Sequence, residues 1–332
     1  MIAAETLRAL SLLTLMVMLF GDRVSIGVLA VLGFIGAVGT VGFSVAAPAL
    51  VPALVPRELL GVSNGRLELA RSLAFASGPA IGGALVAWAG APSAFVLATL
   101  LSGSAIVMLC RIVEPARAQL IPRHPWVDIR EGARLVWREP LLRPILLTAA
   151  AWNTAWFVLQ AIYVPYAMRF LGLNASGVGL TLAAYGAGMV SGALLAPAVL
   201  RRLRFGHAVL VGPVVSVLAS ATMVATVQWR SGGLAALAFF LFGVGPILWT
   251  ISSTTLRQTV TPSLMLGRVS AIFLTVNAGA RPVGAALGGV IGASWGETAC
   301  LVVALGGFTL QAGFIVASKV RVLKALPTAA AT

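Results

Sequence analysis

Long apolar runs, separated by short polar or basic stretches, recur along the whole chain. They occupy residues 4–22, 24–45, 66–90, 92–113, 143–168, 176–200, 207–228, 233–257, 266–292 and 296–318. Each is about 20 residues long, the length that an α-helix needs to cross about 30 Å of hydrocarbon. None alternates apolar and polar residues with a period of two, as membrane-spanning strands would. The pattern therefore predicts ten transmembrane helices.

The composition supports this interpretation. Hydrophobic residues make up 59% of the 332 residues and charged residues only 10%, with a mean hydropathy of +1.00. Soluble domains carry about 25% charged residues. The sequence therefore predicts an all-α polytopic membrane protein in contact with the lipid bilayer.

Basic residues outnumber acidic ones by 23 to 9, and their positions explain the net charge of +14. If the N-terminus is cytoplasmic and the spans alternate, all basic residues fall on the cytoplasmic side except Arg23, Arg169, Arg230 and two arginines within spans. This is the positive-inside pattern, and it predicts that both termini are cytoplasmic. The charge therefore indicates topology, and no nucleic-acid partner is expected.

The reactive side chains form no recognisable site for metal or catalysis. Cys110 and Cys300 lie toward opposite membrane faces in this topology, and His124 and His207 lie in loops without a second ligand nearby. No Ser-His-Asp set, glycine-rich phosphate loop or C-x-x-C motif is present. We therefore expect no metal, no cofactor and no enzymatic activity.

An internal repeat relates the two parts of the chain. "VPRELLGVSNGRLELARSLAFASGPAIGG" and "VTPSLMLGRVSAIFLTVNAGARPVGAALGG" share a proline, a Gly-Arg pair, a second proline and a glycine-rich tail in the same order. The Gly-Arg pairs lie 202 residues apart (267 − 65) and the later prolines 203 apart (282 − 79). Two parallel repeats related by an axis along the membrane normal are expected.

The repeat also predicts the domain organisation. Residues 1–113 form an incomplete N-terminal half-bundle of four helices, 114–142 a cytoplasmic linker with an amphipathic helix, 143–318 a six-helix bundle and 319–332 a cytoplasmic tail. Subtracting the repeat distance from the spans at 143–168 and 176–200 places their counterparts before residue 1. We therefore expect this chain to correspond to a twelve-helix protein from its third helix onward.

Four segments resemble the major facilitator superfamily, and within it the branch of drug and siderophore exporters. They are "PALVPRELLGVSN", "GPAIGG" at 78–83, "DIREGARLVWREPLLRP" at 128–144 and "LRQTVTPSLMLGRV" at 256–269. The resemblance covers nearly the whole chain and implies a secondary transporter. The chain departs from the family pattern in two places: the glycines upstream of "GPAIGG" are replaced by larger residues, and the family's D-R-x-G loop would fall before residue 1.

The "GPAIGG" segment resembles the antiporter motif of the family's fifth helix through Gly78, Pro79, Gly82 and Gly83. Proline leaves one helical carbonyl unpaired and bends a helix, and glycines permit close backbone approach. Small residues also pack ordinary membrane helices. Because Pro282 and Gly284 follow at the repeat distance, we favour a shared hinge or packing role in both halves.

Polar and aromatic residues on one stripe of the 143–168 helix indicate a substrate cavity. Asn153, Trp156, Gln160 and Tyr163 are spaced 3, 4 and 3 residues apart, and Trp152 lies alongside. Buried amides need a partner or water, which favours a cavity for Asn153 and Gln160. Trp249 on the 233–257 helix is a weaker candidate. Aromatic residues also serve as packing and interface anchors, and Tyr163 stays ambiguous for this reason.

Glu68 and Arg71 lie one turn apart near the predicted cytoplasmic start of the 66–90 helix, so that they can form an ion pair. One interpretation is an interfacial pair in which Arg71 extends to the headgroups. The other makes Glu68 a proton-coupling or gating acid, since it is the only acidic residue placed well within a predicted span.

Arg281 lies 15 residues after residue 266, or roughly 22 Å along the helix, and no obvious acidic partner lies at that depth. Asn277 shares its face. An intramembrane charge of this kind faces water, protein or a ligand rather than lipid, and we place both residues in the substrate cavity. An arginine that only binds backbone carbonyls is the alternative.

These features predict a monomeric, proton-coupled exporter of a small amphipathic or anionic molecule in the bacterial inner membrane. An uptake transporter is the alternative within transport. An inactive remnant or a membrane partner subunit is the alternative outside it.

Overall fold

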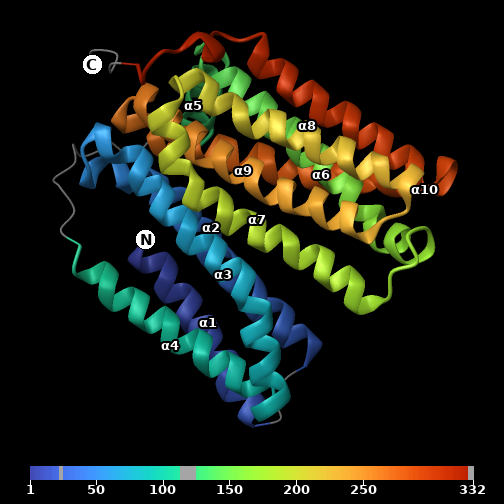
Figure 1. Ribbon diagram of the computed structural model, residues 1–332. Coiled ribbons are helices and arrows are strands. Elements are labelled where there is room, and N and C mark those ends of the chain that lie inside the picture. Colours follow the sequence, from blue (N-terminus) through green and yellow to red (C-terminus); the bar gives the residue numbers. More distant parts are fainter. Residues whose placement is uncertain (22–24, 113–124, 328–332) are drawn as a thin grey trace. The chain divides into compact units, whose positions relative to one another are not determined.

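The computed structural model describes residues 1–21, 25–112 and 125–327 (Figure 1). Over these ranges the chain forms α-helices and three short 3-10 helices, and no strand occurs. Because hydrocarbon offers no water to backbone N–H and C=O groups, a helix is the form expected of apolar runs this long. The all-α prediction is therefore confirmed. The chain divides into two compact units, which are described separately.

The first unit contains residues 1–56 and 77–121. Its helices are α1 (Ile2–Phe20), α2 (Ile26–Leu54), the part of α3 (Leu60–Ala89) from Ser77 onward, and α4 (Ala91–Cys110). Helix α1 packs against both α2 and α4. Arg8 of α1 pairs with Glu5, which is 2% exposed, and donates to the Ser102 hydroxyl of α4 at 3.3 Å.

The second unit contains residues 57–76 and 122–332. It begins with η1 (Arg57–Leu59) and the first turns of α3, and continues with α5 (Pro125–Arg138), α6 (Leu142–Arg169), α7 (Ala175–Arg202), α8 (Phe205–Trp229) and α9 (Gly232–Val260). It ends with η2 (Ser263–Met265), α10 (Leu266–Val316) and η3 (Lys319–Val322). Helix α10 packs chiefly against α6, and α9 packs against α7 and α8. Trp156, Phe239, Phe242 and Phe308 lie in its largest core cluster.

Helix α10 bends sharply at Gly296, whose φ of 81° and ψ of 172° are not helical. Only glycine adopts this combination without steric cost. The two arms fold back on each other, because the Cys300 thiol lies 3.4 Å from the carbonyl oxygen of Gly288. The arms correspond to the two spans predicted at 266–292 and 296–318.

Eight helices in the described part of the chain are long and apolar enough to cross a membrane. The two arms of α10 count as one of these, and α3, whose first turns carry Arg66, Glu68 and Arg71, is not among them. The count of ten therefore stays a prediction. Two boundaries differ most from the prediction: α2 continues to Leu54 through Pro48 and Pro52, and α3 begins at Leu60, ahead of the predicted 66. Membrane helices tolerate such prolines because neighbouring groups satisfy the freed carbonyls.

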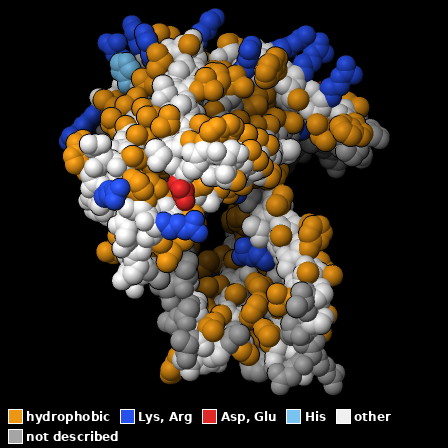
Figure 2. All heavy atoms as spheres, turned by 90° about the vertical axis from the view of Figure 1, so that its right-hand side faces the viewer, with side chains coloured by type: hydrophobic (Ala, Val, Ile, Leu, Met, Phe, Trp, Pro, Cys, Tyr) orange, Lys and Arg blue, Asp and Glu red, His pale blue; other side chains and the backbone are white. Residues whose placement is uncertain are grey.

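Most basic residues of the second unit gather at one end. They lie where α7 and α9 end, where α8 and α10 begin, and in η3. The carbonyls of Leu323 and Lys324, which follow η3, accept hydrogen bonds from the first residues of α8. Figure 2 shows Lys and Arg side chains in a row at one end of the surface, above flanks rich in apolar side chains. Charge at one end and apolar flanks are typical of a membrane-embedded bundle.

Glycines on the first arm of α10 bring this helix against α6. A Cβ at Gly284 would overlap the Thr154 carbonyl oxygen, and one at Gly288 would lie 2.8 Å from the Val158 oxygen. The neighbouring Gly289 has no atom of the described chain within 4 Å of such a Cβ. The α6–α10 contact is therefore of the small-residue type common between membrane helices.

We expect Gly288→Ala to lower the stability of the purified protein by about 1–3 kcal/mol, because the added methyl group must push apart two backbones. Gly289→Ala, one residue away, should leave stability unchanged or raise it slightly, since alanine favours a helix. Thermal unfolding in detergent measures both. Equal stability of the two variants would show that α6 and α10 are not packed as described.

Candidate functional site

Arg281 lies on the first arm of α10 with its side chain exposed. Its Nε donates to the Asn153 side-chain oxygen of α6 at 3.3 Å, and its guanidinium lies 5.8 Å from the centre of the Phe157 ring. In the described part of the chain no acidic side chain lies within ion-pair distance of it. The structure thus brings Arg281 and Asn153 together, 128 residues apart in the sequence, and leaves most of the guanidinium donors available.

The two asparagines beside Arg281 differ in their hydrogen bonding. Asn153 donates from its amide nitrogen to the Ala149 carbonyl at 2.9 Å, which turns its oxygen toward Arg281. Asn277 is half-buried, and its side-chain oxygen is buried without a partner in the described chain. A buried unsatisfied amide oxygen is costly. A donor from water or from a bound molecule would relieve that cost.

An aromatic row runs next to this polar group. The rings of Trp152 and Trp156 stack at 5.4 Å, Trp156 stacks on Tyr185 of α7 at 5.1 Å, and Tyr185 meets Phe75 of α3 edge-on at 6.0 Å. Trp156 is only 7% exposed and also packs against Phe242. Trp152 and Tyr185 are partly exposed, so they, rather than Trp156, offer surface to a ligand.

The remaining residues of the predicted cavity stripe lie in different environments. Gln160 is half-buried, whereas Tyr163 is fully buried, with its hydroxyl on Thr181 of α7. Trp249 is partly buried beside a core cluster that includes residues of α6, α8 and α10. No hydrogen bond or ring contact in the described part of the chain joins it to Arg281. Its neighbour Ser252 donates to its own helix, at the Leu248 carbonyl.

Glu68 and Arg71 form the ion pair that their spacing allows, with 3.3 Å between Nη1 and Oε2. Glu68 is 8% exposed, whereas the side chain of Arg71 is 65% exposed. Tyr185 interacts electrostatically with both Glu68 and Arg281. Tyr185 of α7 therefore lies within electrostatic range of both the acid of α3 and the arginine of α10.

The glycine-proline motif is described only in part. Gly78 and Gly82 lie in α3, and no atom of the described chain comes within 4 Å of a Cβ built on either. The side-chain surroundings of Pro79 and Gly83 lie outside what the structure describes. Pro282 lies within α10 next to the tightly packed Gly284. A hinge role in either half stays a prediction.

Sequence reasoning missed a polar cluster between the start of α3 and the end of α9. Asn64 donates to the Thr255 hydroxyl at 3.0 Å and to the Gln258 side-chain oxygen at 2.7 Å, and Arg57 donates to the Thr259 carbonyl at 2.7 Å. The partners are at least 191 residues apart. The only local signal was the presence of amides in apolar helices, which require partners.

No group of three His, Cys, Asp or Glu residues able to hold a metal ion occurs in the described chain. His207 is exposed, and His124 lies outside the described residues. Cys110 and Cys300 are free thiols.

Comparisons with known proteins agree with this architecture. Residues 1–285 match the model of the Major Facilitator Superfamily. The MFS-type transporter y4rN of Sinorhizobium fredii is 30% identical over 251 residues, which cover 73% of this chain and 60% of that protein. The enterobactin exporter EntS of Salmonella choleraesuis is 30% identical over 248 residues, or 74% of this chain and 58% of that protein.

The match spans less than two thirds of the length of either relative. Among solved structures, the human organic anion transporter MFSD10 (TETRAN) superimposes with a TM-score of 0.78 at 18% identity, covering 95% of this chain and 76% of that one. At this identity the likeness concerns the fold alone. The helical architecture, the family model and the relatives together show that this multi-span membrane protein belongs to the Major Facilitator Superfamily, a family of transporters and not of enzymes.

Proposed function

We propose that the chain is a monomeric secondary transporter of the bacterial inner membrane, with both termini in the cytoplasm, that exports a small amphipathic or anionic molecule in exchange for protons. Arg281 carries this proposal. It is a permanent positive charge in an apolar helix, exposed and without an acidic partner in the described chain. Intramembrane charges of this kind mark substrate or ion pathways.

The neighbours of Arg281 favour an anion with an apolar or aromatic body. The planar guanidinium suits bidentate binding of a carboxylate, sulfonate or phosphate. Asn153 and Asn277 supply further polar contacts, and the partly exposed rings of Trp152 and Tyr185 offer apolar surface nearby. A few oriented polar groups among aromatic side chains are the usual composition of a small-molecule site.

The relatives support the proposed direction. EntS of Salmonella choleraesuis is an enterobactin exporter, and its match covers 74% of this chain. The orientation rests on the basic end of the second unit, which we place in the cytoplasm by the positive-inside rule. Glu68, buried and paired with Arg71, is the acid that we assign to proton coupling.

The proposal predicts active accumulation of an aromatic anion. The 332-residue chain is reconstituted into proteoliposomes with its basic end outward, and anilinonaphthalene sulfonate is added outside. When the lumen is made acidic, protons leave as the dye enters, so we expect the dye to accumulate well above the level in protein-free vesicles. Phenylnaphthylamine, which lacks the sulfonate, controls for partition into lipid.

Each other outcome identifies an alternative. Depletion of preloaded dye by an acidic lumen would indicate uptake with protons. Absence of any protein-dependent flux, with the protein folded in the vesicles, would favour an inactive remnant or a partner subunit and would reject the exporter proposal for this chain.

A further inference from the structure

Helix α5 carries two faces of different chemistry. On the inner face, Asp128 and Glu131 hold Arg268 of α10 at 2.7 and 2.9 Å, and Val136 is buried at 1% exposure in a core cluster. A Cβ at Gly132 would lie 3.2 Å from the Cβ of Arg268, so the backbones approach closely. One face of α5 is therefore packed against α10 and held there by two ion pairs.

The outer face is exposed and combines arginines with large apolar side chains. Its members are Trp126, Ile129, Arg130, Ala133, Arg134, Trp137 and Arg138. Trp126 is 72% exposed and Trp137 56% exposed. In the described chain no acidic side chain lies within 4 Å of Arg130, Arg134 or Arg138. This face therefore combines three arginines that have no acidic partner in the described chain with the exposed side chains of Trp126 and Trp137.

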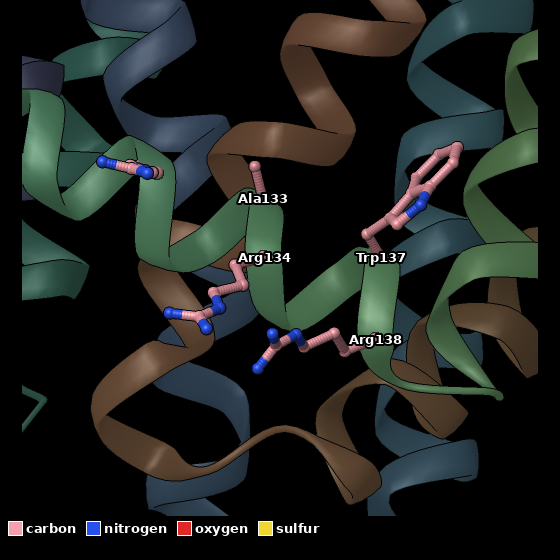
Figure 3. Close-up of a pocket in the computed structure, with 5 residues that line it drawn as sticks. Ala133, Arg134, Trp137 and Arg138 are labelled. Atoms are coloured by element: carbon pink, nitrogen blue, oxygen red, sulfur yellow. The ribbon is translucent and has the colours of Figure 1, made fainter.

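A shallow hollow of about 490 Å³ lies on this face, lined by Arg130, Ala133, Arg134, Trp137 and Arg138 (Figure 3). The side chains of Arg134 and Arg138 extend to the same side of α5. Residues four apart are neighbours on a helix, so Arg130, Arg134 and Arg138 form one row. The guanidinium of Arg143 lies 4.6 Å from the Trp137 ring and adds a fourth positive charge nearby.

We propose that the outer face of α5 is a docking site for the headgroups of anionic phospholipids. A row of arginines attracts phosphate headgroups, and tryptophan prefers the boundary between headgroups and acyl chains. Amphipathic helices that lie in a membrane interface combine these two features. An acidic protein would complement the charge of the arginines, but it would not explain why Trp126 and Trp137 are exposed. The proposal does not depend on the transport function.

Native mass spectrometry of the full chain in a neutral detergent tests the proposal, with phosphatidylglycerol and phosphatidylcholine as separate probes. We expect the wild type to retain phosphatidylglycerol in preference to phosphatidylcholine. Each basic residue near an anionic surface contributes about a fivefold gain in affinity, so replacing three should weaken binding on the order of 100-fold. Inorganic phosphate at the same concentration should not compete, because it lacks the acyl chains.

The matched pair of variants separates a site from diffuse attraction. One triple variant removes three charges from α5 through Arg130→Gln, Arg134→Gln and Arg138→Gln. It leaves the ion pairs of Asp128 and Glu131 with Arg268 intact. Arg201→Gln, Arg202→Gln and Arg204→Gln remove three exposed charges between α7 and α8, at the same end of the second unit. Only the α5 triple variant should lose phosphatidylglycerol, while its thermal stability without lipid matches the wild type.

A second variant, Trp137→Ala, should weaken phosphatidylglycerol binding with all arginines present. Equal loss in both triple variants, or equal binding of the two lipids by the wild type, would overturn the proposal. It would also be overturned if polyglutamate bound the wild type and not the α5 variant while phosphatidylglycerol bound both, since the occupant would then be an acidic protein.

Discussion

Replacing Arg281 by alanine is expected to abolish concentrative transport of the aromatic anion and to leave the folded protein intact. The side chain is exposed, and its one hydrogen bond in the described chain is the 3.3 Å contact to Asn153, so little folding energy depends on it. Loss of a charged hydrogen-bonding partner for a desolvated ligand costs about 2–5 kcal/mol, which corresponds to roughly 30-fold or more in affinity. Dye binding to the purified protein and flux in proteoliposomes measure the effect.

Two further variants distinguish ligand binding from a structural role. Arg281→Lys keeps the charge but not the planar set of donors, so it should retain partial activity. Arg143→Ala is the matched control, because Arg143 is also an exposed arginine lying over an aromatic ring, that of Trp137. This variant should transport normally. If Arg281→Ala unfolds at a much lower temperature and the surviving molecules still transport, Arg281 is a structural residue and the proposed site is wrong.

The helices were predictable because each apolar run is long and its ends carry basic or turn-forming residues. Predicted and observed ends of α6 and α7 agree to within two residues. The prediction was wrong at the end of α2, which continues beyond residue 45 through Pro48 and Pro52 to Leu54. Proline limits a helix in water more strictly than in a bilayer, where leaving the helix exposes more backbone to hydrocarbon.

The site was predictable only one helix at a time. The four-residue spacing of Asn277 and Arg281 indicated a shared polar face, and the amide of Asn153 required a partner, but nothing local indicated that Arg281 and Asn153 meet. Helical spacing also grouped Trp156 with Asn153, although Trp156 belongs to the core. A stripe on a helix shows which residues point the same way, and only the neighbouring helices decide whether they meet core or open space.

Tyr185 illustrates what the sequence could not supply. It lies in a span of otherwise small and apolar residues, and no pattern in the sequence connects it with either charged site. In the structure its ring touches Phe75, two turns after Glu68, and stacks on Trp156, three residues after Asn153. A change of charge at Glu68 therefore acts on the electrostatic environment of Tyr185, which also interacts with Arg281. We propose Tyr185 as the side chain through which protonation of Glu68 would affect an anion bound at Arg281.

Replacing Glu68 by glutamine is expected to reduce dye accumulation driven by a pH gradient at least tenfold and to leave dye binding at Arg281 nearly unchanged. Glutamine has almost the same shape as the acid but cannot release a proton, and Arg71, whose side chain is 65% exposed, is left to solvent without a large penalty. Exchange of dye across vesicles without a pH gradient should continue. The ratio of driven to undriven flux therefore reports coupling alone.

Glu5 offers the matched control. It is a buried acid, 2% exposed, paired with an arginine three residues away as Glu68 is, but it lies in α1 of the first unit. If Glu68 carries the proton, Glu5→Gln should keep most of the driven accumulation, and Tyr185→Phe, which retains the ring but loses the hydroxyl, should lower it without unfolding the protein. If Glu68→Gln keeps full pH-driven flux, the Glu68–Arg71 pair is only an interfacial ion pair. If Glu5→Gln alone loses pH-driven flux, the proton-coupling acid lies in the first unit.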